Sequence, residues 1–207
     1  MLASSFQRSL RQCCRAKTIA NLPVRCDKAF TNRVFSSDVK GSIPIDGIGV
    51  EVGQYAMVER SFSAEQVLQF GNLIHDLNPL HLTWQEETLP LELQTHPLLL
   101  QQEKQEGPSS SLPRPIVHGM LVSSLFSSIF GTLVPGAVYM NQTLNFSAPV
   151  FVDDLVVGRV DITRVRNFKA GGVVVTCDTR VLRKETECVS GKANVWLPGA
   201  SKKTPAS

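Results

Sequence analysis

Hydrophobic and polar residues between positions 55 and 74 predict a strand followed by a helix. The stretch YAMVERSF, residues 55–62, has a short strand-like pattern that ends in charged residues. Ser63 and Gln66 then have the spacing of a capping box, in which side chains bond the free backbone groups at a helix start. The next hydrophobic residues recur at the spacing of one helix face: Val67, Phe70, Leu73 and Ile74. Together these features predict a helix that begins after Ser63.

A proline limits this helix on its C-terminal side. Pro79 disfavours helical backbone at Asn78, so the helix is expected to end near Asp76. The stretch NLIHDLNPLH, residues 72–81, therefore covers the helix end and the turn after it. It contains two histidines, two asparagines and one aspartate among apolar residues. Such a concentration of polar groups indicates either a structural turn or a reactive site.

A second hydrophobic segment, HGMLVSSLFSSIFGTLVPG, opens at His118-Gly119 and closes at Pro135-Gly136. Its apolar residues occupy two faces of a helix, so this helix is expected to be largely buried. One face consists of Val122, Phe126, Ile129 and Leu133, and the other of Leu121, Leu125 and Phe130. Residues 82–115, which join the two helices, contain several prolines and a serine-rich run and predict a long irregular connection.

The remainder of the chain reads as strands. In VYMNQTLNF, residues 138–146, hydrophobic and polar positions alternate, and three further segments continue a β-rich pattern between Gly or charged turns: DDLVVGRVDITRV, GGVVVTCDTRVL and CVSGKANVWL. One buried helix followed by about four antiparallel strands predicts an α+β fold in which a sheet wraps a helix.

The first 35 residues differ in composition from the rest. They carry seven basic residues and one acidic residue, with serines and short apolar runs between them. This composition is typical of an organelle transit peptide. The stretch NRVFSS resembles the Arg-x-Phe-Ser cleavage pattern of mitochondrial presequences, with the cut after Phe35. We therefore expect a transit peptide at 1–35 and a location in the mitochondrial matrix; a disordered basic tail is the alternative.

The mature part of the chain has a different charge. The whole chain has a net charge of +3, whereas residues 36–207 have 14 basic and 17 acidic residues, a net charge of −3. The charge gives no reason to expect a nucleic-acid partner. No stretch approaches 18 uninterrupted apolar residues, so no transmembrane helix is expected. Cys177 and Cys188, the two cysteines left after residue 35, are expected to be free thiols.

Asp76 and His81 are the candidate catalytic pair. A carboxylate and an imidazole held close together can position one water and move two protons. Pro79 stiffens the turn between them, and the amide of Asn78 suits a structural role in that turn. On spacing alone, a capped helix end remains an alternative. A metal site formed by His75, Asp76 and His81 is a further alternative, although no close second cluster of ligands supports it.

Gly119 is a candidate oxyanion site. It precedes a long helix, where backbone N–H groups lack partners and the helix dipole is positive. Because glycine has no side chain, a substrate carbonyl that gains negative charge can approach its N–H closely. Two proton-transferring groups plus such a donor are what enolate chemistry beside a thioester requires.

Four stretches in order, FGNLIHDLNPLH, PIVHGM, LVPG and LNFSAPVFVDD, resemble the MaoC-like (R)-specific hydratase and dehydratase family. The hallmark of that family is Asp-x-Asn-Pro-x-His, here Asp76 to His81, and the similarity covers roughly residues 55–197. The resemblance implies a hotdog fold, an antiparallel sheet wrapped around a long central helix. It implies a domain at 55–198, preceded by a lead-in at 36–54 and followed by a tail at 199–207.

For the chemistry, the resemblance implies that Asp76 and His81 are catalytic, that the Gly119 N–H is the oxyanion donor and that His118 shapes the site. No metal and no cofactor are expected. Two departures stand out: the family commonly has Ser-Gly where this chain has Ile74-His75, and residues 82–115 are longer than usual. His75 is therefore a further candidate for the proton network.

With the predicted presequence, the resemblance is to the mitochondrial 3-hydroxyacyl-ACP dehydratases of the family. It implies reversible dehydration of a (3R)-hydroxyacyl thioester, carried on acyl carrier protein, in fatty acid synthesis. An (R)-specific enoyl-CoA hydratase and a non-catalytic module that binds acyl chains or a protein are the alternatives. A homodimer is expected, because hotdog domains usually pair; no nucleic-acid or membrane partner is expected. The leucines of residues 82–115 are expected to flank an acyl tunnel, and a surface insertion is the alternative.

Overall fold

The computed structural model describes residues 39–85, 88–100 and 112–202. The predicted transit peptide with its cleavage site and the serine-rich part of residues 104–111 lie outside the described residues. In the described part of the chain, no helix is long and apolar enough to cross a membrane.

The main sheet has seven strands, all paired antiparallel, in the order β1-β3-β6-β7-β8-β4, with β5 also paired to β8. The three long strands at its centre are those that the sequence predicted in the C-terminal half. The bounds of the strands are β1 Val39–Gly41, β3 Tyr55–Arg60, β4 Val138–Gln142, β5 Asn145–Phe146, β6 Val156–Asn167, β7 Val173–Arg183 and β8 Thr186–Leu197.

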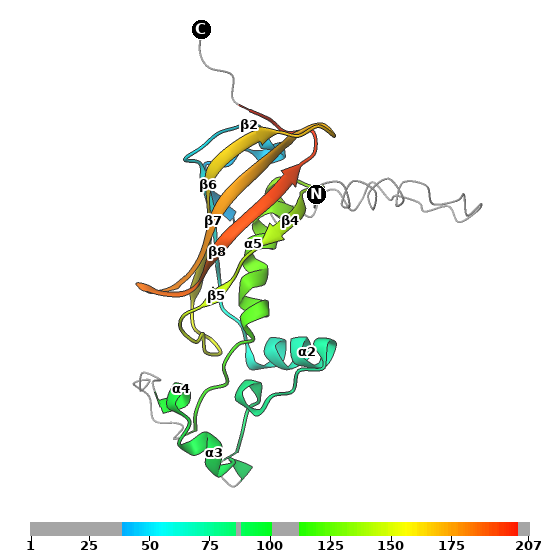
Figure 1. Ribbon diagram of the computed structural model, residues 1–207. Coiled ribbons are helices and arrows are strands. Elements are labelled where there is room, and N and C mark those ends of the chain that lie inside the picture. Colours follow the sequence, from blue (N-terminus) through cyan, green and yellow to red (C-terminus); the bar gives the residue numbers. More distant parts are fainter. Residues whose placement is uncertain (1–38, 86–87, 101–111, 203–207) are drawn as a thin grey trace, which may run out of the picture. The chain divides into compact units, whose positions relative to one another are not determined.

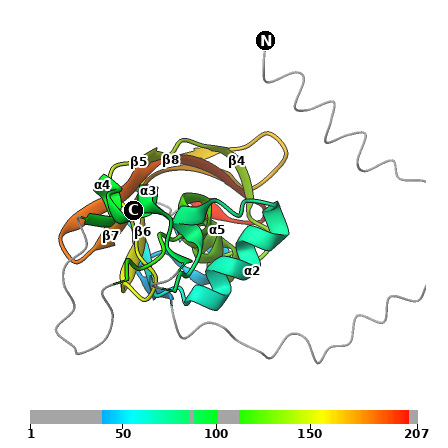
Figure 2. The same cartoon turned by 90° about the horizontal axis from the view of Figure 1, so that it is seen from below.

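The long helix α5, Gly119–Leu133, lies in the curve of this sheet, as the views in Figures 1 and 2 show. Residues from both predicted apolar faces are buried, which confirms the largely buried helix and the α+β fold. Gly158 of β6 permits this contact, since a Cβ atom there would lie 2.8 Å from the Cβ of Leu125. Burial of the helix between valine-rich strands supplies the main hydrophobic core.

Helix α2, Ala64–Ile74, begins with the predicted capping box: Ser63 accepts a bond from the Gln66 N–H, and the Gln66 side chain bonds the Ser63 N–H. The helix ends two residues before the predicted end. His75 adopts a left-handed backbone with φ of 58°, and its N–H bonds the Gly71 carbonyl, which ends the helix there. The turn that carries Asp76 therefore starts directly after α2.

Strand pairing extends on both sides of the predicted 55–198 domain. In the lead-in, β1 pairs with β3, and β2 (Ile48–Val50) follows the 3-10 turn η2, Ile45–Gly47. In the tail, β9 (Ser201–Lys202) pairs in parallel with β2. The described parts of both flanking segments thus belong to the folded unit.

Residues 82–115 are less irregular than predicted. They contain two one-turn helices: α3 (Leu91–Gln94), which Pro90 precedes as the N-cap residue, and α4 (Pro97–Leu100), which begins at Pro97. Proline stabilises the first turn of a helix because it lacks only an N–H that has no partner there. Pro97 therefore starts a helical turn within a segment for which the sequence predicted an irregular connection. Leu93 and Leu99 of this segment form a second hydrophobic cluster with Ile116 and Phe151.

The segment 138–146 forms two strands rather than one. β4 and β5 both pair with β8, but a register irregularity lies between Tyr139 and Asn141. The Tyr139 ring packs on the core beside Phe130, whereas Phe146 is 52% exposed. The simple alternation of the sequence is therefore broken, and Phe146 is left on the surface near the start of α5.

Candidate active site

The turn after α2 is held by its own polar side chains. Asn78 caps the 3-10 turn η3, Pro79–His81, by accepting a hydrogen bond from the Leu80 N–H at 3.0 Å. The Asn78 N–H donates in turn to Oδ1 of Asp76 at 3.2 Å. Asn78 therefore fixes the backbone between Asp76 and His81, and it leaves the second carboxylate oxygen of Asp76 available.

The His81 ring is oriented by a main-chain carbonyl. Its Nδ1 lies 2.6 Å from the carbonyl oxygen of Ile116. Because a carbonyl oxygen can only accept, Nδ1 carries the hydrogen, and in the neutral ring Nε2 is then the unprotonated nitrogen. Nε2 faces Oδ2 of Asp76 at 3.9 Å. The ring thus presents a proton acceptor to the carboxylate side of the site.

Asp76 stands at the open side of this group. Its Oδ2 lies 3.9 Å from Nε2 of both His81 and His118. These separations exceed a direct hydrogen bond but fit a bridging water or hydroxyl. The Asp76 side chain is 47% exposed, against 16% for His81 and 4% for His118. A small molecule can therefore reach the pair from the side of the carboxylate.

His118 closes the inner side of the site. Its Nε2 lies 3.1 Å from the backbone oxygen of Asp76, and its ring stacks on that of His81 with 3.7 Å between centroids. Burial lowers the pKa of His118, and the neighbouring His81 adds to this; the Asp76 backbone and charge oppose it. The ring is therefore neutral at pH 7, with Nε2–H donating. Its buried Nδ1 has no hydrogen-bond partner among the residues described.

Gly119 is the first residue of α5 and directly follows His118. Its N–H belongs to the first turn of the helix, where no intrahelical acceptor exists and the dipole favours negative charge. A Cβ atom at this position would lie 2.7 Å from the ring of Phe146. Because Gly119 has no side chain, the Phe146 ring can lie against the start of the helix. It lies there beside the Gly119 N–H, the predicted oxyanion donor.

The same side chains form a possible metal-ligating group. Ligand atoms of Asp76, His81 and His118 lie within 4.8 Å of one another. This set differs from the alternative considered from sequence, because His75 is exposed and is not part of it. Nε2 of His118 already donates to the backbone carbonyl of Asp76, so it would have to lose that proton and that bond in order to ligate a metal ion. The geometry suits proton transfer better than tetrahedral ligation.

Three neighbours of the site residues were not predicted from the sequence. Ile116 contributes only its carbonyl, Phe70 places its ring 5.3 Å from that of His118 at a steep angle, and Phe146 covers Gly119. A main-chain acceptor has no signature in a sequence, and both phenylalanines read as ordinary hydrophobic positions. The candidate His75 supplies the left-handed backbone at the helix end, and the residue is exposed.

His118 is expected to gain its proton below the ordinary value of 6.5, because burial lowers its pKa. The unfolded chain then protonates first as the pH falls, so this residue stabilises the fold above pH 6.5, and that contribution is lost as the pH falls below it. Titration of the four histidine rings by NMR measures the midpoint directly. A midpoint for His118 at or above 6.5 would contradict a buried neutral ring. The variant His118→Gln should show a smaller fall in Tm between pH 7 and pH 5 than the wild type. The control variant His96→Gln should show the same fall as the wild type.

Comparison with known proteins identifies the family. A family model described as "MaoC like domain" matches residues 104–184. The (R)-specific enoyl-CoA hydratase of Aeromonas caviae is 36% identical over 152 residues, which are 72% of this chain and 96% of that protein. The mitochondrial 3-hydroxyacyl-[acyl-carrier-protein] dehydratase of Arabidopsis thaliana is 30% identical over 151 residues, 72% of this chain and 78% of that protein.

The solved structures agree with the sequence relatives. The solved structure of the (R)-hydratase from A. caviae superposes on this chain with a TM-score of 0.55 at 36% identity; it is described as involved in PHA biosynthesis. The superposition covers 72% of this chain and 98% of the hydratase chain. The predicted hotdog fold is confirmed by this neighbour, and the predicted family by the relatives. The chain belongs to the MaoC-like family of hydratases and dehydratases.

Proposed function

We propose that the chain is a hydro-lyase that reversibly dehydrates (3R)-hydroxyacyl thioesters on acyl carrier protein to trans-2-enoyl thioesters, in mitochondrial fatty acid synthesis. The observation that carries the proposal is the pair formed by Asp76 and His81. Its Oδ2 and Nε2 atoms are 3.9 Å apart, with the His81 tautomer fixed by Ile116. The relative from A. thaliana, named for the same activity, supports the choice of substrate.

The geometry suits addition and removal of one water. In the hydration direction, a water between Asp76 and His81 gives a proton to the pair while its oxygen bonds to C3 of the enoyl chain. The pair then delivers one proton to C2, so that the elements of water are added and the site returns to its first state. Dehydration is the same path reversed. Nε2 of His81, unprotonated in the described tautomer, is suited to take the first proton.

Gly119 serves the thioester carbonyl in this scheme. Negative charge grows on that oxygen when C2 loses its proton, and an N–H at a helix start stabilises it without any reorganisation. The N–H is adjacent in sequence to His118, whose ring stacks on His81. The same helix start thus bears both the donor for the carbonyl and the inner wall of the proton-transfer pair.

Replacing either member of the pair tests the proposal. Asp76→Asn and His81→Ala are each expected to lower kcat/KM with a crotonyl thioester by about 10²–10⁴-fold, because each removes a proton-transferring group. Loss of enoyl absorbance on hydration measures the rate, and Tm shows whether the variants are folded. His96→Gln, a histidine outside the pair, is the control and should keep wild-type turnover. Wild-type rates in both variants would overturn the assignment.

A second candidate is an (R)-specific enoyl-CoA hydratase, because the 36% identical relative carries that name. Comparing kcat/KM for CoA and acyl-carrier-protein esters of one chain length separates the two. Preference for the CoA ester would favour the second candidate. The third possibility, a binding module without catalysis, predicts binding of enoyl thioesters with no change in their absorbance.

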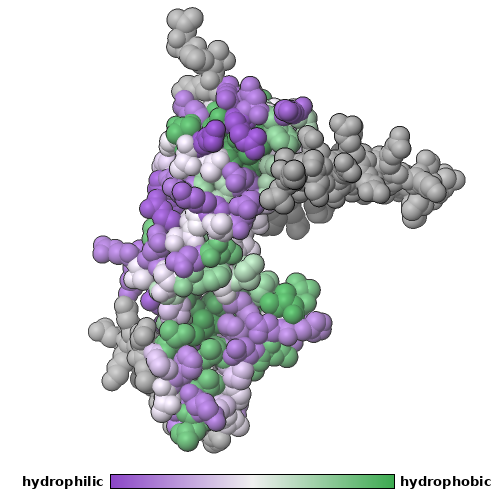
Figure 3. Space-filling model, in the orientation of Figure 1, coloured by the Kyte–Doolittle hydropathy of each residue, from purple (hydrophilic) through white to green (hydrophobic). Residues whose placement is uncertain are grey.

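We include a homodimer in the proposal. Strand β4 ends the order of the sheet, and apolar side chains around the site are exposed; hydrophobic surface surrounds α2 in Figure 3. These exposed apolar side chains include Leu73 at 77%, Met120 at 59%, Phe146 at 52% and Leu77 at 51% exposure. Surface of this kind favours burial against another chain. Light scattering at micromolar concentration should give twice the chain mass; the mass of a single chain would contradict this part.

The proposed mitochondrial location rests on the basic N-terminal segment and is supported by the mitochondrial relative from A. thaliana. Removal of the segment after Phe35 would leave Ser36 as the first residue. Mass spectrometry of the protein recovered from mitochondria should find that N-terminus; an intact Met1 there would count against a cleaved presequence.

A further inference from the structure

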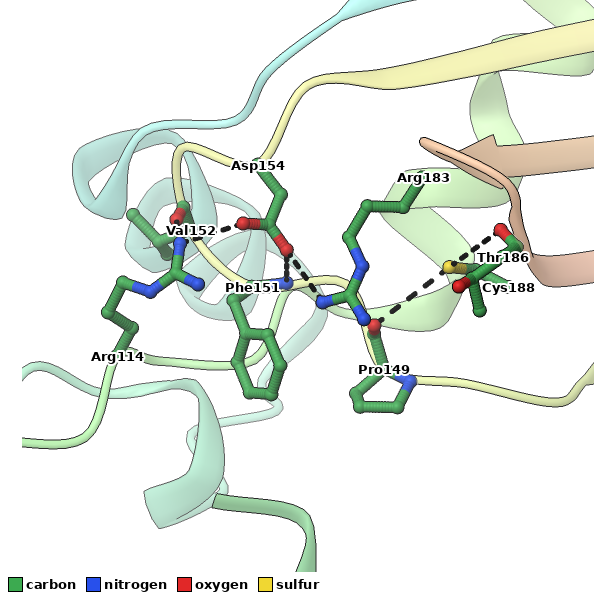
Figure 4. Close-up of polar contacts among 8 residues, drawn as sticks. All are labelled: Arg114, Pro149, Phe151, Val152, Asp154, Arg183, Thr186 and Cys188. Carbon is green, nitrogen blue, oxygen red and sulfur yellow. Dashed lines mark hydrogen bonds and ion pairs between the residues drawn. The ribbon is translucent and has the colours of Figure 1, made fainter. Parts of the chain in front are cut away.

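Asp154 joins two arginines that come from distant parts of the chain (Figure 4). Its side chain is 13% exposed. Oδ1 accepts a hydrogen bond from Nη1 of Arg114 at 2.7 Å, and Oδ2 accepts from Nη1 of Arg183 at 2.9 Å and from the Phe151 N–H at 3.2 Å. One largely buried carboxylate therefore holds residues from three separate parts of the chain: the segment before α5, the turn before β6 and the end of β7.

The segment before α5 is fixed on this side by further bonds. Arg114 also donates to the Val152 carbonyl at 3.0 Å, and the Val152 N–H bonds the Pro115 carbonyl at 2.9 Å. Ile116 forms an antiparallel bridge with Phe151. Residues 114–116 thus run beside the turn that Asp154 closes, and their position depends on it.

On its other side the same segment contacts the catalytic turn. The Ile116 N–H donates to the Leu80 carbonyl at 2.8 Å, and the Ile116 carbonyl accepts from Nδ1 of His81 at 2.6 Å. Two residues later the chain reaches His118. Ile116 therefore connects the turn that contains Asp154 to Nδ1 of His81. The hydrogen on Nδ1 leaves Nε2 as the basic nitrogen of that ring.

The charges of the cluster make it rigid. Burial alone would raise the pKa of Asp154, but the bonds from Arg183, Arg114 and the Phe151 N–H outweigh this and hold the pKa below its ordinary range. The two guanidinium groups also lie over the Phe151 ring, at 5.3 and 5.6 Å from its centroid. Neutralising the carboxylate leaves two like charges facing each other across that ring, which favours a shift of the segments that carry them.

We propose that Asp154 is a positioning residue: it fixes the segment 114–116 and, through the Ile116 carbonyl, the orientation and tautomer of His81. The kinetic consequence rests on the proposed function, whereas the effect on the His81 ring does not. Arg114 and Arg183 take part because both bond the Asp154 carboxylate; these three residues are called the Asp154 clamp.

The chain contains a matched control for this clamp. Asp161 on β6 likewise joins two arginines: it accepts from Arg159 at 2.6–3.0 Å and from Arg180 at 3.0 Å. Hydrogen bonding to Arg159 lowers the pKa of Asp161 as well. This cluster lies on the strands β6 and β7 and has no hydrogen bond to residues 114–118. Asp154→Asn and Asp161→Asn therefore remove the same kind of interaction, but only the first acts on His81.

The direct measurement is the ring ¹⁵N spectrum of His81 in the full chain. The wild type should show hydrogen on Nδ1 alone at a pH where the ring is neutral. Asp154→Asn should give a mixture of the two tautomers, and Asp161→Asn should match the wild type. If the tautomer is unchanged in Asp154→Asn, the positioning role is refuted.

Kinetics provide the second readout. With a crotonyl thioester, Asp154→Asn should lower kcat about 10- to 100-fold, since a small misplacement of a proton-transferring group has a cost of that order. KM should stay within about twofold, because the substrate contacts are unchanged. Asp161→Asn should leave both constants within about twofold, and Asp154→Glu should recover part of the loss. Equal losses in the Asp154→Asn and Asp161→Asn variants would mean general destabilisation and overturn the proposal.

Two further outcomes keep the inference separate from the function. If Asp154→Asn does not fold, Arg183→Gln takes its place, because it removes the bond from Arg183 to Asp154 and leaves the bond from Arg114. The kcat of Arg183→Gln is then expected to be lower than that of Asp161→Asn. Equal kcat values in these two variants overturn the proposal. If the wild type hydrates no thioester but the His81 tautomer changes in Asp154→Asn, the proposed function fails and the positioning role stands.

Discussion

The hydrogen bond from His81 to the Ile116 carbonyl is the interaction on which the site depends. It joins two segments that are 35 residues apart in sequence. Because the acceptor is a main-chain oxygen, no protonation change of the acceptor can weaken it, and the ring is held in one tautomer. The Ile116 N–H donates at the same time to the carbonyl of Leu80, the residue before His81. Both backbone polar groups of Ile116 therefore bond the turn that carries His81.

The hydrophobic core places the polar groups of the site. Burial of helix α5 along the sheet fixes the position of its N-terminus, where His118 is the N-cap residue and Gly119 the first residue of the helix. The close approach at Gly158 sets the distance between helix and sheet. The second hydrophobic cluster around Phe151 performs a similar task for residues 114–116. Apolar packing thus helps to determine where the Asp76 and His81 side chains lie.

Local sequence signals predicted the elements whose causes are local. The capping box located the start of α2, and the hydrophobic spacing located α5 and the long strands. The short strands β1, β2 and β9 depend on partners far away in the chain, so nothing within them reveals their pairing.

The site followed the same division. The motif from Asp76 to His81 was found because its residues are neighbours in sequence, and sequence adjacency also drew attention to His75. The structure places His118, which the family resemblance also implied for the site, beside the pair, because the stacking of its ring on His81 depends on the path of α5; it leaves His75 exposed. The roles of Ile116 and Asp154 arise from a carbonyl and from an ion pair between distant segments, which residue types alone do not disclose.

The stacked rings of His81 and His118 limit how much charge the site can store. Their centroids are 3.7 Å apart, and two imidazolium ions at that distance repel strongly in a partly buried place. A positive charge on one ring therefore disfavours a positive charge on the other, and Oδ2 of Asp76 lies within 3.9 Å of Nε2 of both rings. A reaction that passes one proton at a time through this group is compatible with that constraint.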